Sequence, residues 1–105
     1  NNADRKAGHL LTDKTGNTFG IDHGVTFNSE DKLRTVLWGW IGQRISDSQL
    51  ADLESLKSQI SGSELEELLT VTEIEALHER LDFLLAQQTM PSPSPNWPAV
   101  PWPVF

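Results

Sequence analysis

Residues 10–21 read LLTDKTGNTFGI, and this stretch decides how the start of the chain folds. Its two short apolar runs, 10–12 and 18–21, have the composition of β-strands, and residues 13–17 between them are rich in turn formers. Gly16 supplies a residue that adopts a positive φ at little cost. The pattern predicts a β-hairpin that folds the chain back and brings the residues before it close to those after it.

Polar motifs flank the predicted hairpin on both sides. Asp4, Lys6 and His9 precede it in a loop over residues 1–9, and residues 21–24, IDHG, follow it and contribute Asp22. Phosphoryl transfer needs acids, a cation and bound metal ions held together, with little covalent work from the protein. We therefore expect these four side chains to form one corner that binds phosphate and metal.

The sequence downstream predicts a mainly helical scaffold over residues 31–89. Residues 32–41, KLRTVLWGWI, place apolar side chains at helical spacing and predict a helix that ends at Gly42. Trp40 should lie in the core. Trp38 points to another side of this helix and should pack beneath the tail or against a further lobe. Arg5 and Arg34 are expected to pair with nearby carboxylates.

Two capping boxes predict where the later helices begin. Ser46 with Gln49 opens a helix whose apolar stripe, with Leu56, runs to Ile60, and Thr72 with Glu75 opens a long helix over 73–88. A short acidic helix over 64–69, with its leucines facing inward, lies between them. The predicted fold class is α+β, mainly α, with one hairpin and about four helices.

The last fifteen residues, PSPSPNWPAVPWPVF, form a distinct tail over 91–105. Proline lacks the amide donor and restricts the residue before it, so the tail should be neither helix nor central strand. A solvated linker would not carry this many aromatic residues. We expect one domain over 1–90 and an extended tail that packs on it and buries Trp97, Trp102 and Phe105.

Composition excludes several classes of function. The net charge of −7 argues against a nucleic-acid groove or an anionic membrane surface as partner. The chain has no cysteine, which excludes disulfides, thiolate zinc sites and a cysteine nucleophile, and suits a reducing cytoplasm. No apolar run is long enough to span a membrane. Because the sequence begins without methionine, we expect a C-terminal piece of a longer cytoplasmic protein.

The motifs of residues 1–24 resemble the catalytic and metal-binding loops of the protein-kinase-like superfamily. The stretches NADRK at 2–6, IDHG at 21–24, LRTVLWGW at 33–40 and the PWP near the end are similar to a poorly characterised bacterial branch of the phosphatidylinositol 3-/4-kinase-like family. The resemblance implies a fragment of the C-terminal lobe of an ATP-dependent kinase, a transferase that moves the γ-phosphate to a hydroxyl whose identity is open.

The resemblance also implies roles for individual residues. Asp4 matches the aspartate that orients or deprotonates the acceptor hydroxyl, and Lys6 matches a lysine directed at the γ-phosphate. Asp22 matches the aspartate that binds Mg²⁺ (or Mn²⁺) bridging the phosphates of ATP, with Gly24 giving backbone freedom beside the metal. His9 stands where the superfamily usually has a metal-binding asparagine. It could bond a phosphate, accept manganese, or signal weakened catalysis, since imidazole is not the ligand magnesium prefers.

Parts of a kinase are not recognisable in this chain. There is no glycine-rich phosphate loop and no strand lysine paired with a helix glutamate. The parent protein is expected to be the phosphotransferase, and the fragment without its N-terminal lobe is expected to be inactive. The alternatives are a pseudokinase or helical interaction module without catalysis, and a metal-dependent phosphohydrolase using Asp4, His9, Asp22 and His23.

Overall fold

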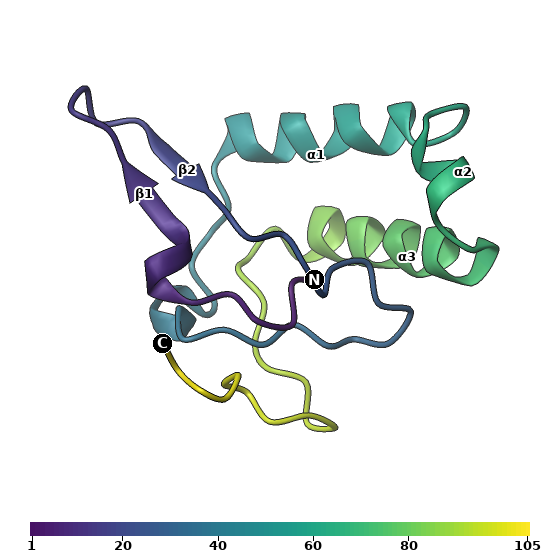
Figure 1. Ribbon diagram of the computed structural model, residues 1–105. Coiled ribbons are helices and arrows are strands. Elements are labelled where there is room, and N and C mark those ends of the chain that lie inside the picture. Colours follow the sequence, from purple (N-terminus) through teal and green to yellow (C-terminus); the bar gives the residue numbers. More distant parts are fainter. The chain divides into compact units, whose positions relative to one another are not determined.

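The computed structural model describes all of residues 1–105 and has an α+β fold that is mainly helical (Figure 1). It contains one two-stranded antiparallel sheet and three α-helices, together with two short 3-10 turns. The chain divides into two units. One consists of Asn1–Thr26, Asp31–Gly39 and Pro93–Phe105, and the other of Phe27–Glu30 and Trp40–Ser92. The tail therefore shares a unit with the predicted site, and the helices form the other unit.

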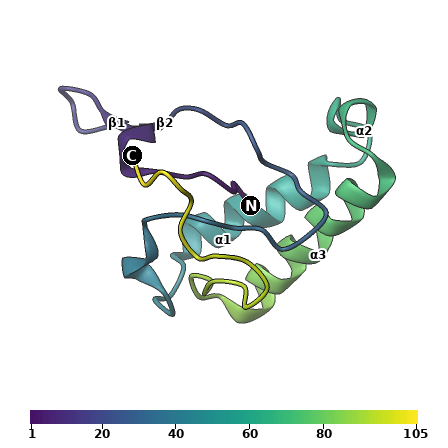
Figure 2. The same ribbon diagram turned by 60° about the horizontal axis from the view of Figure 1, so that its bottom comes forward.

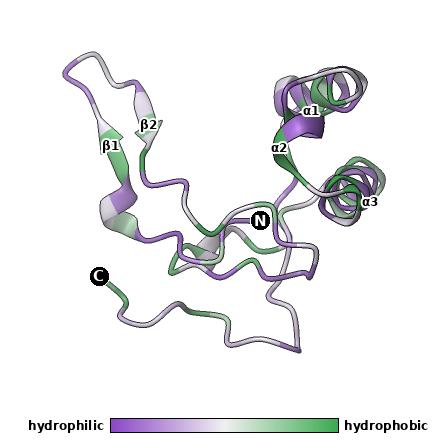
Figure 3. Ribbon diagram, turned by 45° about the vertical axis from the view of Figure 1, so that its right-hand side comes forward, coloured by the Kyte–Doolittle hydropathy of each residue, from purple (hydrophilic) through white to green (hydrophobic).

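The predicted hairpin is present in the first unit. Strand β1 (Leu10–Thr12) pairs antiparallel with β2 (Thr18–Gly20), and Leu11 lies opposite Phe19. The Asp13 carboxylate closes the turn by accepting hydrogen bonds from the amides of Thr15 (2.8 Å) and Asn17 (2.9 Å). Gly16 adopts a φ of 90°, as the turn chemistry predicts. Although β1 is hydrophobic (green in Figure 3), its leucines are exposed.

The helix predicted over 32–41 is wrong. This segment is extended apart from a 3-10 turn, η2 (Trp38–Trp40). Its backbone bonds to other segments instead: the Arg34 amide donates to Asn2 O (3.2 Å) and the Thr35 amide donates to Ala99 O (3.1 Å). The Thr35 amide and the Val36 amide, which donates to Arg5 O at 3.3 Å, would have been paired inside a helix over 32–41, so tertiary pairing overrides the helical spacing.

The two tryptophans of η2 also differ from each other. The Trp38 indole Nε1 donates to Ala99 O at 2.9 Å, so Trp38 contacts the tail, which was one of the two expected placements. Trp40 is 52% exposed and is not a core residue, contrary to prediction. Without a helix through 32–41, no buried stripe is formed for Trp40 to join.

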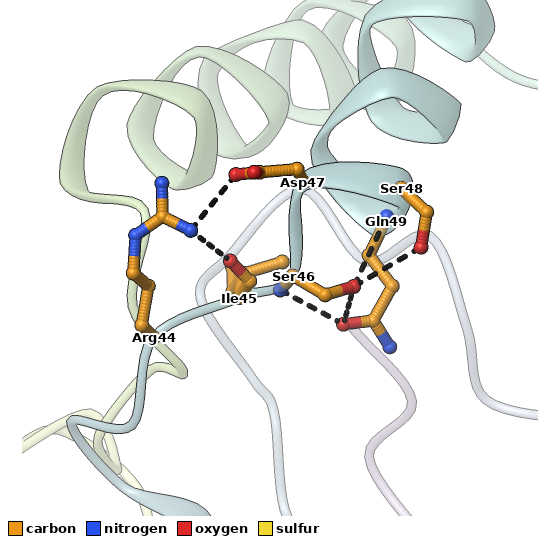
Figure 4. Close-up of polar contacts among 6 residues, drawn as sticks. All are labelled: Arg44, Ile45, Ser46, Asp47, Ser48 and Gln49. Carbon is orange, nitrogen blue, oxygen red and sulfur yellow. Dashed lines mark hydrogen bonds and ion pairs between the residues drawn. The ribbon is translucent and has the colours of Figure 1, made fainter.

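Helix α1 (Asp47–Gln59) begins at the predicted capping box. Ser46 Oγ accepts from the Gln49 amide (3.3 Å), and Gln49 Oε1 accepts from the Ser46 amide (3.2 Å), as Figure 4 shows. Arg44 adds an ion pair with Asp47 at 2.9 Å. That pair is exposed, so the cap contributes more to the start of the helix than the pair does.

Helix α3 (Val71–Gln87) begins two residues earlier than predicted. Thr70 is its N-cap: Thr70 Oγ1 accepts from the Glu73 amide (3.3 Å), and Glu73 Oε2 accepts from the Thr70 amide (2.8 Å). The predicted box at Thr72 and Glu75 is wrong, because two threonine–glutamate pairs of the same spacing overlap here and the first one caps the helix. Gln88, with a φ of 57°, ends it.

Helices α1 and α3 pack against each other and are connected through the short α2 (Leu65–Leu68) (Figures 1 and 2). Lys57 on α1 lies 2.6 Å from Asp82 on α3. Ile45, Ile60, Ala76 and Leu81 are buried. None of the helices is long and apolar enough to cross a lipid bilayer.

Two leucines predicted to face inward do not. Leu56 is 41% exposed and Leu68 is 76% exposed. Leu56 lies near the end of α1 and Leu68 is the last residue of α2, and both keep a large part of the side chain in contact with solvent.

The tail is extended, as predicted, but it buries only part of its apolar surface. Pro101 is fully buried, and Trp97 is half-buried beneath the Lys32 ammonium, which lies 3.8 Å from the ring centroid. Trp102 and Phe105 are 86% and 94% exposed, so their predicted burial is wrong. Both follow Pro101, the last residue of the chain that is buried.

Candidate functional site

The hairpin brings His9 and Asp22, which lie on its two sides, next to each other, whereas no side-chain hydrogen bond or ion pair joins Asp4 or Lys6 to either of them. Beyond the β1–β2 ladder, the Ile21 amide donates to His9 O at 2.8 Å and continues the pairing. This register places His9 Nε2 3.6 Å from Asp22 Oδ2. The two residues expected to hold a metal thus lie side by side although twelve residues separate them in the sequence.

Asp4 and Lys6 form the second pair of the site. The Lys6 ammonium lies 3.3 Å from Asp4 Oδ1, with the lysine side chain 13% and the aspartate 33% exposed. Arg5, between them, makes an extended parallel bridge with Thr35. In extended backbone, residues two apart point to the same side, and this alternation explains why the acid and the cation meet.

Asn2 connects the two motifs and was not among the predicted site residues. Its side chain is buried in the loop that carries Asp4. Asn2 Oδ1 accepts from the Asp4 amide at 2.7 Å, and Asn2 Nδ2 donates to Asp22 O at 3.4 Å. The sequence signal was an asparagine two residues before Asp4, a spacing typical of a side chain that caps a local turn.

Arg5 also binds the segment around Asp22, through the residues on either side of it. Arg5 Nη1 donates to Ile21 O at 2.6 Å, and Nη2 lies 3.1 Å from His23 Nδ1. Because arginine can only donate, His23 Nδ1 accepts, which leaves the proton of the neutral ring on Nε2. The expected pairing of Arg5 and Arg34 with carboxylates is not what the structure shows. Arg34 Nε also bonds a backbone oxygen, that of Ala3, at 2.9 Å.

The backbone around Asp22 is strained at two positions. Asp22 and Val25 have φ values of 54° and 55°, in the left-handed region that a β-branched valine rarely adopts. Gly24, between them, is not in that region. The prediction that Gly24 provides backbone freedom at this turn is therefore wrong. Such strain costs on the order of 1–3 kcal/mol per residue and persists only where neighbours impose it, as the Ala3 amide does by donating to Val25 O at 3.0 Å.

His9 is more buried than an ordinary surface histidine. Its side chain is 18% exposed, and its buried Nδ1 has no hydrogen-bond partner, which is uncommon for a buried polar atom. Its Nε2 faces the 60% exposed carboxylate of Asp22. The ring therefore offers one nitrogen to the site and keeps the other inside the protein.

The potential metal ligands around Asp22 are its own carboxylate and the His9 imidazole. No group of three or more histidine, aspartate or glutamate side chains is placed to hold a metal ion. The four residues that the phosphohydrolase hypothesis requires therefore do not form a metal-binding group. Magnesium in phosphotransferases commonly takes one or two carboxylates and completes its shell with phosphate oxygens and water. The exposed Asp22 carboxylate fits that arrangement, with His9 beside it.

The chain is similar to a known bacterial protein. Protein Rv2133c of Mycobacterium tuberculosis is 44% identical over 108 residues, an alignment that covers all of this chain and 38% of that protein. The chain therefore spans less than half the length of its curated relative. No family model matches the chain. No solved structure matches it either.

Proposed function

We propose that this chain is part of the catalytic lobe of an ATP-dependent phosphotransferase that resembles the phosphatidylinositol 3-/4-kinases. The observation that carries the proposal is the meeting of two motifs: one hairpin brings His9 to Asp22, while Asn2 bonds both the Asp4 loop and the Asp22 turn. The bonds of the buried Asn2 link the loop that carries Asp4 to the turn that carries Asp22, which supports a common site for the two motifs.

Asp4 and Lys6 would act on the reacting groups. Asp4 positions the acceptor hydroxyl and takes up its proton, and the Lys6 ammonium, 3.3 Å away, attracts the γ-phosphate. Because both side chains emerge from one extended segment, the hydroxyl and the phosphate are directed to the same place. Positioning of this kind accounts for a large part of phosphoryl-transfer catalysis.

Asp22, with His9 beside it, would hold the metal ion. A bound Mg²⁺ supplies charge neutralisation on the phosphate oxygens. The Asp22 carboxylate provides the hard oxygen ligand, and Asn2 and Arg5 fix the backbone on either side of it by bonding Asp22 O and Ile21 O. Arg5 and Asn2 are thus positioning residues in this scheme.

The proposed activity belongs to the longer protein. The chain contains no glycine-rich phosphate loop and no strand lysine with a glutamate partner, which kinases use to bind ATP. We expect residues 1–105 to bind Mg-ATP weakly and not to turn over. Transfer to a lipid, protein or small-molecule hydroxyl would then depend on parts of the parent protein outside this chain.

The test uses the full-length parent protein and its Asp22→Asn variant. Mg-ATP binding is measured by calorimetry, and phosphotransfer by release of ADP. Asp22→Asn should weaken Mg-ATP binding by about tenfold or more, because it replaces the anionic metal ligand with a neutral amide. Asp31→Asn is the matched control, since Asp31 is exposed and lies in the same unit. A parent protein that binds no Mg-ATP, or equal binding by both variants, would refute the proposal.

An interaction module without catalysis is the second candidate. It is favoured by the tail, whose Trp102 and Phe105 are 86% and 94% exposed and leave a large aromatic surface uncovered. Under this hypothesis, Asp22→Asn leaves partner binding intact, whereas removal of these two aromatic side chains abolishes it. Comparing Asp22→Asn with a variant that lacks the Trp102 and Phe105 side chains, both in the parent protein, therefore separates the two functions.

A further inference from the structure

A groove of about 400 Å³ lies in the helical unit, between the last turns of α1 and the short α2. Its walls are largely aliphatic: Leu56 and Ile60 contribute from the end of α1, and Leu65 and Leu68 from α2. It contains none of the residues assigned to the phosphate site. A partner bound in the groove would therefore contact none of those residues.

The groove exposes apolar side chains that the fold leaves uncovered. Ile60 is 1% exposed and forms the floor, whereas Leu56 and Leu68 on the walls are 41% and 76% exposed. Covering such leucines is favourable because apolar surface leaves water. Two exposed leucines beside one apolar depression are a feature of protein-binding surfaces.

The charge around the groove is strongly acidic. Glu64 lines it, and Glu66 and Glu67 follow on α2. Residues 47–87 contain ten acidic and only two basic side chains. Both of the basic side chains are already engaged: Lys57 pairs with Asp82 at 2.6 Å, and Arg80 donates to Asn28 O at 2.8 Å. Arg44, just before α1, pairs with Asp47 at 2.9 Å, and the helical unit still has a large excess of acidic side chains and presents a negative field.

We propose that this groove binds a basic amphipathic helix of a partner protein. Its apolar residues, spaced three and four apart, would cover Leu56 and Leu68, and its lysines and arginines would face Glu64 and Glu67. A nucleic acid would be repelled by the same field. A second copy of this chain would bring an equally acidic helical unit, and like charges oppose that contact.

The test measures binding of a labelled synthetic helix to residues 1–105 by fluorescence anisotropy. The probe peptide consists of leucine and lysine at amphipathic spacing. One control peptide replaces its lysines with glutamates, and another replaces its leucines with alanines. The probe should bind, and its affinity should fall as salt is raised. Both control peptides should bind at least about tenfold more weakly, because each lacks one of the two complementary features.

Variants of the chain locate the binding surface. Leu68→Ala and Glu64→Lys should each weaken binding of the probe by about fivefold or more. Val71→Ala and Glu75→Lys are matched controls, since Val71 is 75% exposed and neither residue lines the groove. Circular dichroism checks that all four variants remain folded.

Three outcomes would overturn the proposal. The first is that no binding of the probe is detected. The second is that the control variants weaken binding as much as Leu68→Ala and Glu64→Lys, which would mean diffuse attraction to the acidic surface. The third is that Leu68→Ala dissociates a dimer of the chain seen by sedimentation, which would assign the groove to a second copy.

Discussion

Two threonines lie at the start of α3, and replacing each with alanine should affect the free energy of unfolding differently. Thr70 is the N-cap: its Oγ1 accepts from the Glu73 amide at 3.3 Å, which would otherwise lack a partner in the first turn. Thr70→Ala removes that acceptor, while Glu73 Oε2 can still accept from the backbone amide of residue 70 at its present 2.8 Å. The expected loss of unfolding free energy is about 1 kcal/mol.

Thr72 lies inside the helix and is exposed. No hydrogen bond to its side chain is needed at the helix start, because Thr70 already provides the cap. Alanine is a better helix former than a β-branched residue, so Thr72→Ala should leave stability unchanged or raise it by up to about 0.5 kcal/mol. The two variants make the same chemical change two residues apart, which makes each a control for the other.

Urea denaturation followed by far-ultraviolet circular dichroism measures both changes, and thermal denaturation should show Thr70→Ala melting roughly 5 °C below the parent chain. Thr70→Ser keeps the hydroxyl and should restore most of the loss. If Thr72→Ala were the destabilising variant and Thr70→Ala neutral, the helix would begin at the second threonine–glutamate pair, and the assigned cap would be refuted.

Two further predictions concern the first unit. Hydrogen bonds from the side chains of Thr15 and Asn17 lower the pKa of Asp13 from its ordinary 3.8 to about 2. The stability that the ionised carboxylate gives the hairpin turn should therefore be complete above about pH 4 and be lost as the pH falls through about 2. NMR titration of the Thr15 amide should show that midpoint, and a midpoint near the ordinary value would contradict it. Trp38→Phe removes the 2.9 Å bond to Ala99 O and should increase proteolysis of the tail, whereas Trp40→Phe, at a 52% exposed position, should not.

Local chemistry predicted the parts of the fold that depend on a few neighbouring residues. The hairpin follows from the turn formed by Asp13 to Asn17, and α1 follows from the Ser46 and Gln49 box. Both elements satisfy their own backbone groups within a short stretch. The start of α3 was wrong by two residues only because two equivalent caps overlap in the sequence.

The segment over 32–41 could not be predicted in this way. Its apolar spacing fits a helix, but its amides bond to Asn2 and Ala99, which lie far away in the sequence. No property of the segment itself specifies those partners. The exposure of Trp102 and Phe105 is also a tertiary matter, because composition shows that a side chain is apolar and does not show whether anything covers it.

The sequence predicted which side chains of the candidate site form pairs, but it did not predict the hydrogen bonds that hold the backbone of the site in place. The order of motifs around the hairpin indicated that His9 and Asp22 would meet, and the two-residue spacing of Asp4 and Lys6 agrees with their contact. The bonds from Asn2 and Arg5 to backbone oxygens of the second motif were not foreseen. Such bonds depend on the exact path of the turn, which no residue type alone specifies.

Backbone hydrogen bonds join the two ends of the segment that contains the α-helices. The Ile45 amide donates to Gln88 O at 2.8 Å, and the Gly42 amide donates to Met90 O at 3.0 Å, so the segment that holds all three α-helices starts and finishes at adjacent points. The backbone on either side of this segment therefore has to span only the width of one hydrogen-bonded pair. Adjacent ends of this kind are the geometry at which a segment is most easily lengthened or replaced, because the flanking backbone keeps its path.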